Sequence, residues 1–220
     1  DLYKKFGKLK NLDQIYTLHD GVDLKKFTKK KSSENRIPTV TYCGSLSKSK
    51  GIDLIIDAAK LINNVEFVII GGLKTELDYY KEIVLKSGVN NVKFVGQVIY
   101  SKVPELLNNS DILLLPATAN EIKSKEYTSA MKLFEYLSVG KPIIASNISS
   151  NTEILKNEVN CLLFEPDNPE SLAGKIKFLI GSKDLKEKLS NNSSKLALKY
   201  SWEERSKKVI NKVKSWNEKE

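Results

Sequence analysis

The sequence predicts an α/β fold with a doubly wound, mostly parallel sheet and helices on both of its faces. Short apolar segments rich in β-branched residues alternate with segments of helical periodicity. Several strand-like segments are apolar at consecutive positions, which is typical of strands buried on both faces. The connections are short and carry glycine at turn positions, as expected where each strand leads into a helix and back to the same sheet.

Seven short segments are the predicted strands. They are Ile15–Leu18, Thr39–Cys43, Glu66–Ile70, Val92–Val95, Ile112–Leu115, Pro142–Ala145 and Cys161–Phe164. Ligands of open parallel sheets bind at the carboxyl ends of the strands. We therefore expect the site in the loops that follow residues 43, 70, 95, 115 and 145.

Six helices are predicted between and after these strands. They are Ile52–Leu61, Glu76–Leu85, Val103–Leu107, Ala130–Leu137, Thr152–Leu155 and Pro169–Ile180. From Lys183 onward the pattern stays helical and contains no strand-like segment. There Trp202, Val209, Val213 and Trp216 recur at intervals of seven, four and three residues, so they form one apolar stripe on a helix.

The composition is that of a globular protein. The 220 residues are 40% hydrophobic and 29% charged, which supplies a full core and excludes a collagen-like or low-complexity chain. No apolar run approaches the roughly 18 residues of a membrane-spanning helix, and residues 1–10 lack the apolar core of a signal peptide. Cys43 and Cys161 lie in apolar segments, which indicates buried thiols in a reducing compartment. We therefore expect a cytoplasmic protein, without a structural zinc site because only one histidine is present.

The formal net charge of +9 suits nucleic acid, an anionic membrane surface or a phosphate-bearing ligand. Only two of the 36 basic residues, Arg36 and Arg205, are arginine. Arginine forks dominate base and phosphate recognition in nucleic-acid-binding proteins, so we expect no nucleic-acid partner. A phosphate-bearing ligand remains, and the inner face of a membrane is a further candidate partner.

The loop after the first central strand is a candidate phosphate site. Gly44 lets a ligand approach the backbone at the strand end. Lys50 precedes a helix whose free N–H groups attract anions. The loop is neither a dinucleotide fingerprint nor a P-loop. The alternative is an ordinary polar turn with solvated lysines.

A second candidate site lies at the start of the helix that is predicted from Ala130. Thr128 and Ser129 are suitable N-caps, and the first turn would direct its amides to the same edge of the sheet. Glu135 lies one to two turns into this helix. It either accepts hydrogen bonds from a sugar diol or forms a surface pair with Lys132, three residues earlier.

Several segments, in order along the chain, resemble motifs in the C-terminal half of retaining glycosyltransferases of the GT-B fold, of the group 1 or family-four type. The resemblance covers residues 15 to about 210. The matching segments are Gly21-Val22-Asp23 with Phe27, Gly44 to Gly51, Phe67–Gly72, Val92–Val98, Ser110–Pro116, Phe134–Pro142 and Tyr200-Ser201-Trp202.

The resemblance implies a Rossmann-like domain that binds the nucleotide-diphosphate sugar of a metal-independent, retaining glycosyltransferase, with a glycan or lipid-linked glycan as acceptor and no cofactor. Residues 1–14 would be a leading segment from the interdomain region and residues 15–182 the donor-binding domain. Residues 183–220 would be helices that pack partly toward an N-terminal acceptor domain that is missing here, so the chain alone would be inactive. The alternative is a non-catalytic nucleotide-binding or assembly domain of the same fold.

The resemblance also implies roles for single residues. Lys50 would contact the donor diphosphate, and Glu135 would hold the ribose hydroxyls and is the best catalytic candidate, supported by Lys50 and Lys132. The backbone of Val98 or Gln97 would bind the base edge. The other substrate-binding positions would be Gly44, Ser45, Gly72, Ala130 and Met131.

Two positions depart from the family pattern. Ser45 stands where the family has arginine, which removes one positive charge from the diphosphate site. Tyr127 stands where the family has the first of two glutamates, and Glu126 is shifted from that position by one residue. Lys132 would replace the lost charge, unless it faces solvent.

Neither His19 nor a metal ion is expected to take part in the site. His19 precedes a turn and is expected to be a turn residue rather than a catalytic one. No Asp-x-Asp triplet occurs, so the sequence does not support a metal-dependent sugar-nucleotide site. Amides and lysines would then neutralise the diphosphate.

Overall fold

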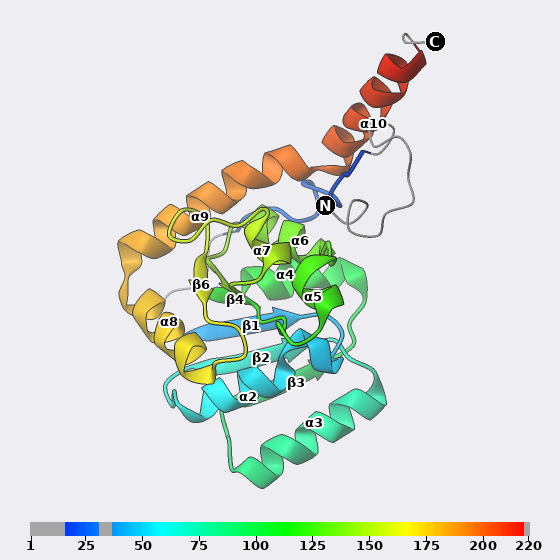
Figure 1. The fold of residues 1–220 in the computed structure, drawn as a ribbon. Helices are drawn as coiled ribbons and strands as arrows, with labels where there is room; N and C mark the ends of the chain where they lie inside the picture. The colour runs from blue at the N-terminus through cyan, green and yellow to red at the C-terminus, as the bar shows by residue number, and fades with distance from the viewer. Residues whose placement is uncertain (1–15, 31–36, 218–220) are drawn as a thin grey trace.

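The computed structural model describes residues 16–30 and 37–217. They contain a six-stranded sheet with helices on both faces (Figure 1). All neighbouring strands are parallel, and their order across the sheet is β3-β2-β1-β4-β5-β6. The strands are β1 (Thr39–Cys43), β2 (Glu66–Ile70), β3 (Val92–Gly96), β4 (Ile112–Leu115), β5 (Ile143–Ser146) and β6 (Leu162–Phe164). The predicted doubly wound α/β fold is therefore confirmed.

Helices follow or connect the strands in the predicted alternation. The α-helices are α2 (Ile52–Lys60), α3 (Lys74–Ser87), α4 (Val103–Asn108), α5 (Ile122–Glu126), α6 (Met131–Val139), α7 (Ser149–Thr152), α8 (Pro169–Gly181), α9 (Lys183–Ala197) and α10 (Trp202–Asn217). The 3₁₀ helices within the described ranges are η2 (Lys48–Lys50), η3 (Tyr100–Lys102) and η4 (Leu198–Tyr200).

Both faces of the sheet are covered by apolar cores. Successive residues of a strand point to opposite faces, and β4 shows the result. Ile112 and Leu114 enter the core that also contains residues of α2 and α8, whereas Leu113 and Leu115 enter the core that contains residues of α4 and α6. Burial on both faces explains why the strands are apolar at consecutive positions.

The chain reverses its direction across the sheet between β1 and β4. It first builds β1, β2 and β3 toward one edge, then returns to the middle and builds β4, β5 and β6 toward the other edge. The connections that leave β1 and β4 therefore diverge to opposite faces. Such a switch point opens a crevice at the carboxyl ends of the two strands.

The predicted strand Ile15–Leu18 is wrong over its described part, because residues 16–21 form no regular secondary structure. Val22 makes only an isolated parallel bridge with Ser201, and its N–H donates to the carbonyl oxygen of Tyr200 (2.9 Å). The segment runs beside the start of α10 rather than along an edge of the sheet. The motifs at Gly21–Asp23 and Tyr200–Trp202 thus meet in space.

Two helix predictions also need correction. The short helix α7 occupies Ser149–Thr152 rather than Thr152–Leu155, because the Asn151 side chain donates to the Ser146 carbonyl (2.9 Å) and winds the chain directly after β5. Helix α5 was not predicted. Its five residues include two lysines and carry no apolar periodicity, so tertiary contacts rather than pattern hold it.

The predicted C-terminal helical region consists of two helices, α9 and α10, joined by η4. Helix α10 extends away from the body of the molecule (Figure 1). On it Trp202, Val209, Val213 and Trp216 are between 37% and 45% exposed, so the predicted stripe is a surface feature, and its packing on another domain stays a prediction. None of the described helices is long and apolar enough to cross a membrane.

Candidate functional site

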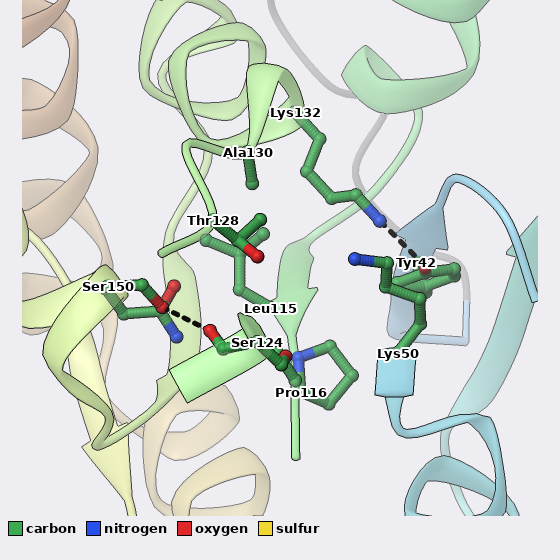
Figure 2. Close-up of a pocket in the computed structure, with 11 residues that line it drawn as sticks. Tyr42, Lys50, Leu115, Pro116, Ser124, Thr128, Ala130, Lys132 and Ser150 are labelled. Carbon is green, nitrogen blue, oxygen red and sulfur yellow. Dashed lines mark hydrogen bonds between the residues drawn. The ribbon is translucent and has the colours of Figure 1, made fainter. Parts of the chain in front are cut away.

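An open pocket of about 370 Å³ lies at the carboxyl ends of β1 and β4 (Figure 2). The loops after β1, β4 and β5 contribute to it together with α5 and α6. The lining residues are Tyr42, Lys50, Leu115, Pro116, Ala117, Ser124, Thr128, Ala130, Lys132, Ser150 and Asn151. The pocket thus occupies the switch point at which the sequence placed the site.

Lys132, the second residue of α6, reaches across the end of the sheet to Tyr42 of β1 (Figure 2). Its Nζ donates a hydrogen bond to the Tyr42 hydroxyl (2.7 Å) and lies 4.0 Å from the centroid of the tyrosine ring. The hydroxyl in turn donates to the carbonyl oxygen of Ser45 (2.7 Å). Lys132 is therefore held in the pocket, and the alternative of a solvent-facing lysine is wrong.

Lys50 brings a second positive charge to the same space. Its side chain rises from η2 toward Tyr42 and Lys132 (Figure 2). No carboxylate among residues 16–30 and 37–217 forms an ion pair with either amine. Burial, reinforced by the charge of Lys50, lowers the pKa of Lys132 to about 7, although Cys43 and Glu135 act in the opposite direction. The arrangement attracts an anion.

The first turn of α6 faces this charged pocket without a side-chain cap. Ala130 is the N-cap residue, and no side chain accepts a hydrogen bond there. The predicted caps are wrong because both hydroxyls bond elsewhere: Thr128 donates to the Lys123 carbonyl (2.8 Å), and Ser129 accepts from the Asp20 amide (3.3 Å). First-turn N–H groups that no side chain satisfies, together with the helix dipole, favour a bound anion.

Gly44 gives Lys132 the space to cross the strand end. Its φ is +150°, and a Cβ built on it would lie 2.3 Å from Nζ of Lys132. Any side chain at this position would displace the lysine. Ser45 is exposed beside it and contributes its carbonyl oxygen to Tyr42 rather than a side chain to the pocket.

Glu135 is buried, with 8% of its surface exposed, and its Oε1 accepts a hydrogen bond from the Tyr100 hydroxyl (2.8 Å). It does not form the surface pair with Lys132 that was the alternative. Burial raises its pKa, while the Tyr100 hydrogen bond and the charge of Lys132 act in the opposite direction. Glu135 lies about one helical turn beyond Lys132, outside the residues that line the pocket and toward the loop after β3.

The other predicted substrate-binding residues do not line the pocket. Val98, in the loop after β3, is partly buried against the core that contains residues of α4 and α6. Gly72 follows β2 with φ +87°, and a Cβ there would lie 2.5 Å from the Leu46 side chain, so glycine permits close packing. Met131 is 46% exposed. Of the predicted residues, Lys50, Ala130 and Lys132 line the pocket itself.

The structure adds lining residues that no sequence pattern indicated. Ser150 of α7 donates to the carbonyl oxygen of Ser124 in α5 (2.8 Å; Figure 2). Ser124 in turn donates to the Ser49 carbonyl (3.4 Å). These bonds join three separate segments into one wall. The position of Tyr42 could have been found from the sequence, because it is the last residue of β1 that faces the core of α2 and therefore lies at the strand end.

His19 lies outside this pocket. Its Nε2 is 3.4 Å from a carboxylate oxygen of Glu153, its ring is near Phe134 and Tyr200, and its carbonyl oxygen accepts from Nε of Arg205 (3.0 Å). These contacts give it a structural place. Within the described part of the chain, no three His, Cys, Asp or Glu side chains gather as metal ligands would.

Tyr127 and Glu126 lie at the end of α5 and outside the lining of the pocket. Tyr127 is the C-cap residue, and its N–H donates to the Lys123 carbonyl (3.1 Å). Glu126 is exposed.

Comparison with known proteins places the chain in one family. The family model "Glycosyl transferases group 1" matches residues 23–196. An uncharacterised glycosyltransferase of Methanocaldococcus jannaschii is 30% identical over 165 residues, which are 74% of this chain and 44% of that protein. The chain spans about half the length of the curated relatives it matches.

Two solved structures share the fold. A glycosyltransferase from Rickettsia africae superposes with a TM-score of 0.79 at 19% identity, over 91% of this chain and 57% of that one. Anabaena Alr3699/HepE, in complex with UDP and glucose, superposes with a TM-score of 0.74 at 22% identity, over 89% of this chain and 55% of that one.

Proposed function

Because this chain belongs to the group 1 glycosyl transferases, we propose that it is the donor-binding half of a retaining glycosyltransferase that uses no metal ion. The donor is a nucleotide-diphosphate sugar, and the acceptor is a hydroxyl group of a glycan or lipid-linked glycan. One observation carries the proposal: Lys50, Lys132 and the uncapped start of α6 converge on one pocket. A similar fold whose structure holds UDP supports it.

The pocket's chemistry is electrostatic. When the bond between the anomeric carbon of the sugar and the diphosphate oxygen breaks, the electron pair and the negative charge stay on the diphosphate. Lys50, Lys132 and the first-turn amides of α6 are in position to stabilise that growing charge, and groups placed in advance stabilise a transition state most. In this proposal they do what Mg²⁺ does in metal-dependent transferases.

The nucleoside extends from the diphosphate toward the loop after β3. Glu135, about one helical turn beyond Lys132, binds the ribose hydroxyls. The backbone at Gln97 and Val98 binds the edge of the base. Since the chain spans about half of its relatives' length, the acceptor site belongs to a further domain. We place the enzyme in the cytoplasm, in glycan biosynthesis, at the inner face of the membrane where the acceptor is lipid-linked.

A thermal-shift screen tests the proposal. The chain is melted with UDP, GDP, ADP, CMP and the corresponding nucleotide sugars, since a ligand at 100 times its Kd stabilises the folded state by about 2.7 kcal/mol. At least one nucleotide diphosphate should raise the Tm of the parent chain and not that of a Lys50→Ala, Lys132→Ala double variant. Lys48→Ala is the matched control, because Lys48 lies in the same 3₁₀ helix but is exposed.

Two outcomes contradict the proposal. If no nucleotide raises the Tm of the parent chain, the pocket is not a donor site. The same conclusion follows if the double variant retains the shift in Tm. The transfer step is tested separately with a labelled nucleotide sugar and an acceptor. Because both halves must close over the donor to exclude water and align the acceptor, the isolated chain should bind the donor without transferring sugar.

A further inference from the structure

Tyr100 connects three parts of the site. It is the first residue of η3, directly after the loop that follows β3. Its ring packs against Phe27, with 5.5 Å between the ring centroids, and its hydroxyl donates to Oε1 of Glu135 in α6 (2.8 Å). The aromatic contact fixes the ring, and the fixed ring sets the direction of the hydroxyl.

Glu135 depends on this hydrogen bond for its orientation. A buried carboxylate is costly unless hydrogen bonds satisfy it. Within the described ranges, Tyr100 is the one group that donates a hydrogen bond to Glu135. A carboxylate offers about four acceptor sites on two oxygens. Tyr100 uses Oε1 and leaves Oε2 for another donor.

We propose that Tyr100 is a positioning residue for ribose recognition: it holds Oε1 of Glu135 so that Oε2 receives the 2′-hydroxyl of the bound nucleotide. The inference rests on the proposed function, which puts a nucleoside diphosphate in the pocket. It adds a residue that neither touches the diphosphate nor lines the pocket. Tyr100 acts through Glu135, and its ring, which is 50% exposed, stays on Phe27.

The electrostatics of Glu135 support this role. Burial raises the pKa of the carboxyl, and the Tyr100 hydrogen bond works against that rise. Without the bond the carboxyl would protonate at a higher pH, and one of its two oxygens would then become a donor instead of an acceptor. The Tyr100 hydrogen bond therefore opposes protonation of Glu135, as does the charge of Lys132 on α6, while Cys43 of β1 is a further titratable group close to this carboxylate.

The experiment compares UDP with 2′-deoxy-UDP, and GDP with 2′-deoxy-GDP, by calorimetric titration of the whole chain. The parent should bind the ribonucleotide more tightly by about tenfold or more, as expected for one hydrogen bond to a charged group. Tyr100→Phe, which keeps the ring on Phe27, should lose most of that ratio while 2′-deoxynucleotide binding changes little. Tyr79→Phe is the control, since Tyr79 is similarly exposed on α3.

The pH profile separates positioning from a merely structural role. Discrimination between ribo- and 2′-deoxynucleotides should disappear in the parent as pH falls through the pKa of Glu135, and the small discrimination left in Tyr100→Phe should disappear at a higher pH. In a Glu135→Ala background, Tyr100→Phe should have no further effect on the ratio.

The outcomes distinguish a failure of the proposed donor site from a failure of the proposed role of Tyr100. A parent that binds neither UDP nor GDP nor any other nucleoside diphosphate of the thermal-shift screen contradicts the proposed function itself. A parent that binds them but does not discriminate, or a Tyr100→Phe variant that discriminates like the parent, overturns the role of Tyr100 and leaves the donor site intact.

Discussion

The hydroxyl oxygen of Tyr42 lies 2.7 Å from Nζ of Lys132, and the same amine lies 4.0 Å from the centroid of the Tyr42 ring. Because the hydroxyl proton goes to the Ser45 carbonyl, the oxygen accepts from Lys132 and its orientation is fixed. The tyrosine therefore holds the lysine beside Lys50 before any ligand arrives. A site placed in advance spends less of its binding energy on ordering side chains.

Replacement of Lys50 tests the diphosphate contact. Lys50→Ala should weaken UDP binding by about 10- to 150-fold, because a hydrogen bond to a charged group contributes about 1.5–3 kcal/mol. Calorimetric titration gives the Kd, and Lys48→Ala, from the exposed side of the same 3₁₀ helix, should bind like the parent. If the Lys50 variant and the parent bind UDP with equal affinity, Lys50 does not contact the diphosphate.

The lowered pKa of Lys132 predicts that donor binding weakens as pH rises. In the free chain this pKa is about 7, and a bound diphosphate, being an opposite charge, raises it. Binding then takes up a proton, so the affinity for UDP-glucose should fall by up to tenfold per pH unit above pH 7. UDP-glucose suits the test because its diphosphate has no terminal phosphate that titrates in this range.

Lys132→Arg is the matched variant for that experiment, since an arginine stays charged. Its affinity should change much less between pH 7 and 9, and calorimetry in buffers of different ionisation enthalpy should show proton uptake only for the parent. A parent profile that is flat over this range would contradict the role of the lysine's titration.

Gly44 should not tolerate a methyl group. In Gly44→Ala the new Cβ would lie 2.3 Å from Nζ of Lys132, and the variant should therefore lose UDP affinity and some thermal stability. The control is Gly174→Ala in α8, where no atom lies within 4 Å of the built Cβ. An exposed helix interior gains about 1 kcal/mol when glycine becomes alanine, so this variant should unfold at a higher temperature and bind UDP unchanged.

Ser138 connects α6 to the segment that precedes the sheet. Its buried hydroxyl donates to the Phe27 carbonyl (2.6 Å). Ser138→Ala leaves that carbonyl without its partner and should lower the free energy of unfolding by about 1–3 kcal/mol. Urea denaturation measures the change. Ser206→Ala on the exposed side of α10, where the hydroxyl bonds only its own helix, should have little effect.

The sequence pattern predicted the six strands of the sheet because strands that are buried on both faces have apolar residues at consecutive positions. Strands such as Ile112–Leu115 are apolar throughout. An apolar run of four residues between turn signals has the length of a strand and is too short for a buried helix. Residues 16–18 have an equally strand-like sequence, yet they lie beside η4 and the first turns of α10 rather than in the sheet. Only the tertiary structure decides this placement. The sequence did not predict helix α5, because its five residues show no apolar periodicity and tertiary contacts hold it.

Part of the site could be predicted from position alone. Lys50 and Ala130 lie at strand-end loops and helix starts, so their place follows from topology. The direction of Lys132 depends on side-chain torsions and on the space above Gly44, which a pattern does not contain. Tyr100 was hidden for a similar reason: its contact with Glu135 spans 35 residues and two elements.

Lys50 and Lys132, which form no ion pair with a carboxylate within residues 16–30 and 37–217, also affect the stability of the folded chain. Lys132 has a pKa near 7 in the folded chain against an ordinary value of 10.5, so the unfolded chain holds more protons between these values and stability should rise with pH across that window. A neutral methionine at this position would fill the same groove and relieve the repulsion from Lys50. Between these pH values Lys132 therefore opposes folding, as expected of a residue whose position is set by binding rather than by stability.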